Sequence, residues 1–224
     1  MAFRTPFISG KDSLNNQFTT EDGRTIAIPP TLLISAIGIV DDANQCVTMD
    51  AKKPGNWLIQ IGLTGPELAG SHFQLIMRMA QPDFPRVDLS TAPKWMAVVA
   101  KLIQSGQIQS AHDCSEGGML VAAAEMAFAG SIGLELDLGG IPRRTELDDL
   151  AACFAETPTR VLLEVDPDAF NDVANELTAN EVPFGRVGTF TDSSRLTVRC
   201  DEHGLLVDEP LNELREIWQA PLDW

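Results

Sequence analysis

The sequence predicts a mixed α/β fold, because strand-like runs and helical stretches alternate along most of its 224 residues. Residues 57–63 form an apolar run after a turn at 54–56, which predicts a strand. Residues 134–138 alternate between apolar and acidic side chains, as a half-buried strand does. Between them, residues 92–105 carry apolar side chains at helical spacing. A chain of this length can bury one sizeable core or two small ones.

The remaining elements follow the same logic. A second helix is predicted at 119–129, ended by Gly130 in the manner of a glycine just past a helix C-terminus. The later elements are a strand at 160–165, a helix at 166–179, a hairpin formed by 184–190 and 195–199, and an amphipathic helix at 211–219. The side chains expected on the apolar side of that last helix are Leu211, Leu214, Ile217 and Trp218.

A domain boundary is predicted between residues 45 and 55, so that residues 1–50 form a first unit and 51–224 a second. In the first unit, residues 5–8 resemble a short strand. Residues 31–40 are almost continuously apolar, which predicts a strand buried on both faces.

Composition limits the function classes. The chain has 32 acidic and 16 basic residues and a formal charge of −16, which argues against nucleic acid as a partner. The longest apolar stretch, 26–40, contains two prolines and is too short to span a membrane. The four cysteines lack C-x-x-C spacing and only three histidines are present. We therefore expect reduced thiols, no structural zinc site, no membrane partner and a cytoplasmic location.

The segment 111–118 is the most informative motif. It places a histidine, two carboxylates, a hydroxyl and two glycines directly before an apolar helical run. The free amides and positive dipole end of such a helix suit a phosphate, and Asp113 can hold Mg²⁺ on that phosphate. The alternative is a plain cap, in which Ser115 caps the helix and Glu116 fills the first turn. These residues alone leave both interpretations open.

A second candidate phosphate segment comprises Gly10, Lys11, Asp12 and Ser13, directly after the run 5–8. It is not a P-loop, because that motif needs a glycine where Thr5 stands and a hydroxyl residue directly after the lysine. A polar turn between strands is the alternative.

Together, residues 6–16 and 112–118 resemble the formylglycinamide ribonucleotide amidotransferase family, also called phosphoribosylformylglycinamidine synthase. Segments 28–38, 64–71 and 124–130 match in the family's order. The resemblance covers about residues 6–140. It implies that residues 51–224 form the C-terminal domain of the aminoimidazole ribonucleotide synthetase-like superfamily. Residues 1–50 would be the last segment of its nucleotide-binding domain.

The resemblance also implies a function. Family members use ATP and glutamine-derived ammonia to convert formylglycinamide ribonucleotide into the amidine, in purine synthesis. It implies ATP/ADP and Mg²⁺ as cofactors, and as partners the upstream half of the synthase and a glutaminase domain or subunit. Asp113 resembles the metal ligand. The nucleotide or phosphate contacts would be Gly10, Lys11, Asp12, Ser13, Ser115, Gly117 and Gly118. Some relatives have an asparagine where Lys11 stands.

No catalytic residue is expected in this chain, because the family's catalytic histidine lies upstream of the matching segments. His112 is expected to orient the loop, and His72 and His203 do not occupy the catalytic position. Cys114 as a nucleophile would need a base and an acidified thiol. The isolated chain is therefore expected to be inactive, as an expressed fragment or a split-gene product.

Two other classes of function stay open. One is another ATP-dependent synthetase or kinase of the same superfamily, such as the aminoimidazole ribonucleotide synthetase, thiamine-phosphate kinase or selenophosphate synthetase types. The other is a non-catalytic structural or dimerisation module that associates through an exposed strand at 26–40. Nucleotide-dependent stabilisation would favour binding, whereas a clean monomer would argue against the module.

Overall fold

The computed structural model describes residues 2–11, 16–29, 31–80, 83–200 and 202–222. It divides into two compact units, Met1–Ala43 and Asn44–Trp224. The second unit has the mixed α/β fold that the sequence predicts. Among the candidate phosphate contacts, Asp12 and Ser13 lie outside the described residues.

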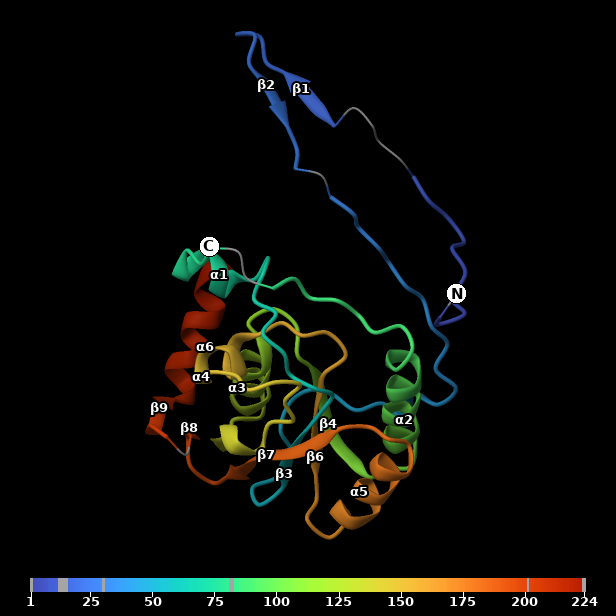
Figure 1. Ribbon diagram of the computed structural model, residues 1–224, viewed down its shortest axis with the longest axis vertical. Helices are drawn as coiled ribbons and strands as arrows, with labels where there is room; N and C mark the ends of the chain where they lie inside the picture. The colour runs from blue at the N-terminus through green and yellow to red at the C-terminus, as the bar shows by residue number, and fades with distance from the viewer. Residues whose placement is uncertain (1, 12–15, 30, 81–82, 201, 223–224) are drawn as a thin grey trace. The chain divides into compact units, whose positions relative to one another are not determined.

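The first unit contains a short hairpin, in which β1 (Gln17–Thr19) pairs antiparallel with β2 (Thr25–Ala27) (Figure 1). Residues 5–8 and 31–40 are not in strands. The predicted buried strand at 31–40 is wrong: Leu33 is 89% exposed and Ile39 94%. An apolar strand stays buried only when layers cover both its faces. The described part of this unit offers a single two-stranded ribbon.

In the described part of the second unit, seven strands form one sheet in the order β4-β6-β3-β7-β5-β8-β9. Their bounds are β3 (Trp57–Ile61), β4 (Ile108–Asp113), β5 (Gly133–Asp137), β6 (Val161–Val165), β7 (Phe184–Thr191), β8 (Arg195–Cys200) and β9 (Gly204–Pro210). β5 and β8 run parallel, and the other neighbours are antiparallel. β4 lies at one end of this order.

The predicted hairpin between β7 and β8 is wrong, because β5 lies between them. Leu134 of β5 pairs with Phe190 of β7 on one side and with Leu196 of β8 on the other. Gly133 makes this insertion possible, since any Cβ there would collide with Ser193 in the turn that joins β7 to β8. β8 instead forms its hairpin with β9, which the sequence analysis did not predict.

Six helices are described: α1 (His72–Met77), α2 (Ala92–Gln104), α3 (Gly118–Gly130), α4 (Asp149–Phe154), α5 (Phe170–Ala179) and α6 (Leu211–Gln219). Short 3₁₀ segments cover Ala43–Gln45, Leu138–Gly140 and Ala220–Leu222. α5 begins later than predicted, because the Asp166 carboxylate accepts the Asp168 N–H and forms a turn. α3 extends through Gly130, which was predicted to lie just past its end, and the capping residue is Ser131, with φ 55°. None of the described helices is long and apolar enough to cross a membrane.

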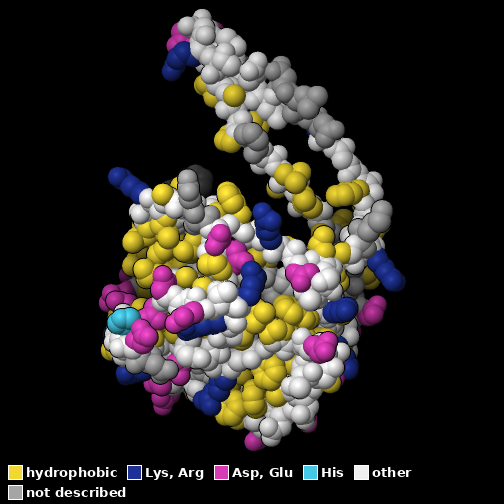
Figure 2. Space-filling model, viewed as in Figure 1, with side chains coloured by type: hydrophobic (Ala, Val, Ile, Leu, Met, Phe, Trp, Pro, Cys, Tyr) yellow, Lys and Arg dark blue, Asp and Glu magenta, His cyan; other side chains and the backbone are white. Residues whose placement is uncertain are grey.

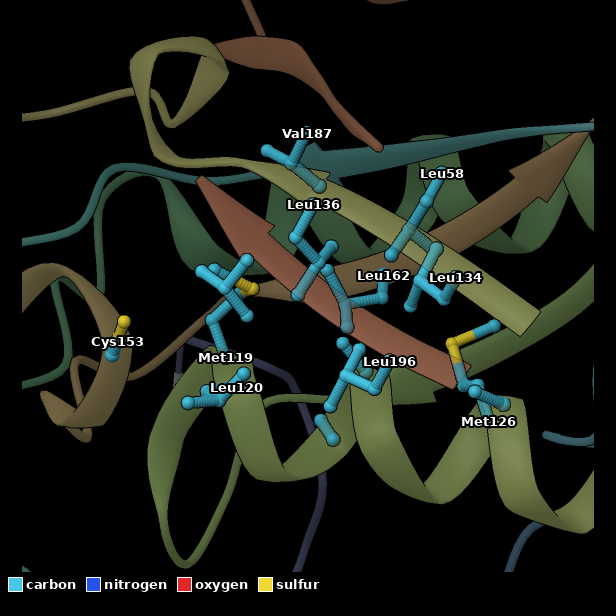
Figure 3. Close-up of a cluster of buried hydrophobic side chains, with 14 of the residues drawn as sticks. Leu58, Met119, Leu120, Met126, Leu134, Leu136, Cys153, Leu162, Val187 and Leu196 are labelled. Atoms are coloured by element: carbon cyan, nitrogen blue, oxygen red, sulfur yellow. The ribbon is translucent and has the colours of Figure 1, made fainter. Parts of the chain in front are cut away.

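Helices cover both faces of the sheet, so the central strands are buried on both sides (Figure 1). Leu58 and Leu162 lie in the cluster that contains α3, where Met119, Leu120 and Met126 point toward the strands (Figure 3). The neighbouring residues along the same strands, such as Ile59 and Leu163, pack with residues of α2 and α5 on the other face. This arrangement explains why β3 and β6 are almost continuously apolar.

The surface keeps several large apolar side chains, as the yellow areas between charged residues in Figure 2 show. Leu75 and Ile76 of α1 are 71% and 77% exposed. The predicted apolar side of α6 is only partly used: Leu211 is buried, whereas Ile217 is 70% exposed and Trp218 49%. Trp218 is thus not a core residue, contrary to expectation.

Candidate functional site

The motif at 111–118 lies where β4 joins α3. Residues 111–113 end β4 and pair with 161–163 of β6. Residues 114–117 form the connection, and Gly118 begins α3. The motif is therefore divided among the end of a strand, a loop and the first residue of a helix. Four candidate residues thus lie in this connection or directly beside it: Asp113, Ser115, Gly117 and Gly118.

The plain-cap interpretation of this motif is wrong about Ser115 and Glu116. The N-cap position of α3 is Gly117, with φ 81°, and no side chain of the described residues makes a cap hydrogen bond there. Ser115 contributes its carbonyl oxygen, which accepts the Gly118 N–H at 3.0 Å, and its side chain is exposed. Glu116 lies before the first helical turn. The hydroxyl of Ser115 is therefore available at the surface.

The start of α3 already has an anion beside it. The Gly117 N–H donates to the Glu156 carboxylate at 2.9 Å. A carboxylate is favoured at a helix N-terminus for the same reasons that a phosphate is. Glu156, which sequence reasoning missed, would therefore compete with a phosphate for this amide.

Gly118 has a packing role that the sequence did not reveal. A Cβ at this position would lie 2.6 Å from the Ala155 carbonyl oxygen and 2.8 Å from that of Cys153. Its φ of +68° also disfavours other residues. Gly118 thus lets the start of α3 approach the end of α4 closely.

Asp113 presents an exposed carboxylate next to a histidine. Its side chain is 72% exposed, and its Oδ1 lies 3.4 Å from His112 Nδ1. The other ring nitrogen of His112, Nε2, lies 2.7 Å from Glu125 Oε2. His112 is held between two carboxylates, which fits the expected orienting role.

This network continues to the C-terminal helix. The second oxygen of Glu125 accepts the indole N–H of Trp218 at 2.8 Å. The Trp218 ring lies 5.7 Å from that of Phe128. Side chains of α6, α3 and β4 are thereby linked in one series, Trp218–Glu125–His112–Asp113. The available sequence signal was Glu125, an acidic residue within an otherwise apolar helix.

Cys114 lies in the same loop but is buried. Burial raises the pKa of its thiol to about 11, although the charge of Arg160 acts in the opposite direction. The thiol is therefore protonated near neutral pH. This agrees with the argument against Cys114 as a nucleophile.

Arg160 stabilises the loop and its surroundings through both its backbone and its side chain. Its carbonyl accepts the Cys114 N–H at 3.1 Å. Its buried guanidinium donates to the Thr157 carbonyl at 2.9 Å, to Thr64 Oγ1 at 3.2 Å and to the Ala155 carbonyl. Burial lowers the pKa of Arg160. The guanidinium thus ties Thr64 to the segment 155–157, which follows α4.

The family-like segment 64–71 lies around this arginine. Thr64 accepts from Arg160, and the Gly65 N–H donates to Thr157 Oγ1 at 2.9 Å. Glu67 accepts from Thr157 at 2.7 Å and from Arg144 at 2.6 Å. Burial acts to raise the pKa of Glu67, but these hydrogen bonds outweigh it and lower the pKa. The segment therefore has a structural role beside the loop.

A second buried acid, Glu164, organises the edge of the sheet next to β4. Its Oε2 accepts the Lys52 N–H at 2.8 Å and the Ser110 hydroxyl at 2.6 Å. Its Oε1 accepts the Lys53 N–H at 3.0 Å and the Asn56 side-chain amide at 2.7 Å. The residue is fully buried. Its four donors tie the segment before β3 to β4 and β6.

The other candidate phosphate residues belong to the first unit. Gly10 and Lys11 are exposed and lie outside β1 and β2. Their contact with phosphate, like that of Asp12 and Ser13, stays a prediction.

Comparison with known proteins defines the class of this fold and loop. Residues 53–201 match the family model of the AIR synthase related protein, C-terminal domain. The chain belongs to this family.

The curated relatives point to one particular enzyme subunit. The chain is 33% identical over 219 residues to phosphoribosylformylglycinamidine synthase subunit PurL of Alkaliphilus metalliredigens, covering 97% of this chain and 28% of the relative. It is 31% identical over 223 residues to the subunit of the same name from Synechocystis, with the same coverage of each chain. The resemblance recognised from the motifs is confirmed. The chain spans about 28% of the length of these relatives.

Solved structures agree on the fold. The structure titled T. maritima PurL complexed with ATP has a TM-score of 0.66 at 17% identity, over 77% of this chain and 27% of that one. E. coli HypE, a hydrogenase maturation protein, has a TM-score of 0.53 at 13% identity, over 74% of this chain and 51% of that one. At these identities, the likeness concerns the fold alone.

Proposed function

We propose that this chain forms part of an ATP-dependent phosphoribosylformylglycinamidine synthase, a ligase of purine synthesis that works in the cytoplasm. The observation that carries the proposal is the match to PurL subunits along 97% of the chain at 31–33% identity. The proposed substrates are formylglycinamide ribonucleotide and ammonia from a glutaminase domain or subunit. The upstream half of the synthase is the other proposed partner.

Within this function, Asp113 is the proposed Mg²⁺ ligand. Its carboxylate is exposed at a strand end, and a hard cation needs one or two such oxygens beside those of a phosphate. Bound Mg²⁺ would neutralise phosphate charge. The contacts of His112 with Asp113 and Glu125 restrict the orientation of the loop, so this network acts as positioning machinery.

Ser115, Gly117 and Gly118 are the proposed phosphate contacts of this loop. The exposed hydroxyl of Ser115 supports a direct contact. The Gly117 amide would become available if the Glu156 carboxylate moved away. Gly118 would contribute mainly by bringing α3 close to α4. Gly10, Lys11, Asp12 and Ser13 remain the proposed phosphate contacts of the first unit.

The test measures ADP release from MgATP with formylglycinamide ribonucleotide and ammonium chloride, which bypasses a glutaminase. We expect no turnover by this chain alone, and substrate-dependent turnover once the upstream half of the synthase is added. Turnover by the chain alone would show that it holds a complete site. Absence of turnover with the upstream half, together with absence of nucleotide binding, would refute the proposed function.

One observation favours a second function, association through the first unit. Its run 31–40 exposes six large apolar side chains, Leu32, Leu33, Ile34, Ile37, Ile39 and Val40. Exposed apolar surface of this kind marks contacts with other polypeptides. Light scattering after size-exclusion chromatography tests this, and a clean monomer at high concentration counts against it.

A further inference from the structure

A second group of functional side chains lies away from the β4–α3 loop. Asp149 is the first residue of α4, Cys200 ends β8, and His203 lies in the turn that leads to β9. One ligand atom from each residue lies within 4.8 Å of the other two. His203 Nδ1 is 2.8 Å from Asp149 Oδ2, and Cys200 Sγ is 3.2 Å from Asp149 Oδ2 and 3.7 Å from His203 Nδ1.

The geometry is not that of a catalytic triad. In a triad, the two nitrogens of the imidazole bridge the nucleophile and the acid. Here the thiol and the carboxylate both lie against the same nitrogen, Nδ1 of His203. Three donor atoms that converge on one point are the arrangement of a metal site.

One of the three separations already fits a tetrahedral ion, and the other two are shorter. With metal–sulfur bonds of about 2.3 Å and metal–nitrogen bonds of about 2.0–2.1 Å, a tetrahedral site separates sulfur from nitrogen by about 3.6 Å. The Cys200–His203 separation of 3.7 Å already has this value. The carboxylate of Asp149 needs to withdraw by only ~0.5 Å to reach the corresponding separations of about 3.4–3.6 Å. In the structure, the Asp149 carboxylate accepts hydrogen bonds from the Cys200 thiol and from His203 Nδ1.

The backbone prepares this arrangement. The His203 N–H donates to Cys200 Sγ at 3.2 Å, which holds the turn between the two residues. Cys200 is 9% exposed, whereas the side chain of His203 is 65% exposed. The site is therefore anchored in the core and open on one side.

The surroundings favour a cation. A cavity of about 760 Å³ adjoins the three residues, and its lining includes the acidic side chains of Glu146, Asp148 and Glu202. Arg143 also lines it, but its guanidinium donates to the carbonyls of Leu147 and Leu138. A fourth ligand position can therefore face water in an acidic cavity.

We propose that Asp149, Cys200 and His203 bind one Zn²⁺ ion, with water in the fourth position. A thiolate, an imidazole and a carboxylate suit Zn²⁺, whereas Mg²⁺ and Ca²⁺ require sets of oxygen ligands. Binding replaces the Cys200 S–H bond with a sulfur–zinc bond and releases that proton to solvent. The Nδ1–H proton of His203 is lost as well, and the neutral imidazole carries its proton on Nε2, so that the lone pair of Nδ1 can bind the ion. The ion would connect the start of α4 to the β8–β9 turn. The expectation of no zinc site relied on the absent C-x-x-C spacing, whereas here the spacing is C-x-x-H with a distant aspartate.

The experiment uses the full chain under reducing conditions, titrated with Zn²⁺ and separately with Co²⁺. We expect one Zn²⁺ per chain, a melting temperature that rises with Zn²⁺ but not with Mg²⁺, and a thiolate-to-cobalt charge-transfer band. Cys200→Ser should abolish the band. Replacing an outer-shell partner already costs about 10–100-fold in metal affinity, so loss of a direct ligand should cost at least that much.

Two variants keep the test decisive. His203→Ala changes an exposed side chain, so it should fold even if Cys200→Ser does not, and it should weaken Zn²⁺ binding to the same extent. Cys46→Ser is the matched control, because Cys46 is exposed and distant in sequence from the three ligands. Binding that survives in the His203→Ala variant, or a cobalt spectrum without the thiolate band, would overturn the proposal. So would equal loss of binding in the Cys46→Ser variant.

Discussion

Gly118→Ala provides a direct test of how the loop is built. Two costs arise at this position. The backbone has φ +68°, and placing an L-residue in the left-handed region costs about 1 kcal/mol or slightly more. The new Cβ would also lie 2.6 Å from the Ala155 carbonyl oxygen and 2.8 Å from that of Cys153. Both are backbone atoms that cannot rotate away, and overpacking of this kind costs about 1–3 kcal/mol.

We therefore expect Gly118→Ala to lower the free energy of unfolding by about 2–4 kcal/mol. Gly106→Ala is the matched control: its φ is +74°, and a Cβ there would meet nothing within 4 Å. The control should lose only the backbone cost of about 1 kcal/mol. Urea denaturation followed by circular dichroism gives both values, provided that the slope with denaturant is unchanged. Equal losses for the two variants would refute the argument that α3 and the end of α4 approach closely at Gly118.

Three further predictions follow from other contacts. Glu156→Gln removes the negative charge beside the Gly117 amide, and we expect calorimetry to show that ADP binds about 2–5-fold more tightly, because a charge at a helix end contributes about 0.3–1 kcal/mol. Glu116→Gln is the control, and an equal gain in that variant would contradict a competition between Glu156 and the phosphate. Glu164→Gln replaces one acceptor oxygen by a donor and leaves two of four donors without an acceptor, so the free energy of unfolding should fall by about 2–4 kcal/mol. A fall of less than about 1 kcal/mol would mean that the segment before β3 rearranges freely. Because burial raises the Cys114 pKa to about 11, iodoacetamide at pH 8 should label exposed Cys46 and spare Cys114 until the chain is unfolded. Mass spectrometry measures both labelling rates, and equal rates in the native protein would disprove the burial of Cys114.

Local patterns predicted those helices and strands whose own periodicity shows which side is apolar. The predicted helix at 211–219 has those bounds as α6, and that at 92–105 differs from α2 by one residue. The apolar runs of β3 and β6 indicated strands, and residues of both strands lie in both clusters of the core. The same reasoning failed for 31–40. An apolar run shows that a strand would need other elements packed on its faces, but it does not show that such elements are present.

The candidate site was only partly predictable for the same reason. The composition of 111–118 located the loop and singled out the carboxylate of Asp113, since both depend on residues adjacent in sequence. Glu156 and Arg160 are about forty residues further along the chain, and their contacts with the loop exist only because β6 pairs with β4. No local pattern carries that information.

The sequence by itself determined the fold class, the positions of helices such as α2, α3 and α6, and through its motifs the family. These properties arise from short-range periodicity and from residues that are close along the chain. Only the tertiary structure decided that β5 separates β7 from β8, that a carboxylate already lies at the start of α3, and that Asp149 meets Cys200 and His203. Each of these depends on strand order. Strand order is set by how the whole chain buries its apolar faces, which no single segment specifies.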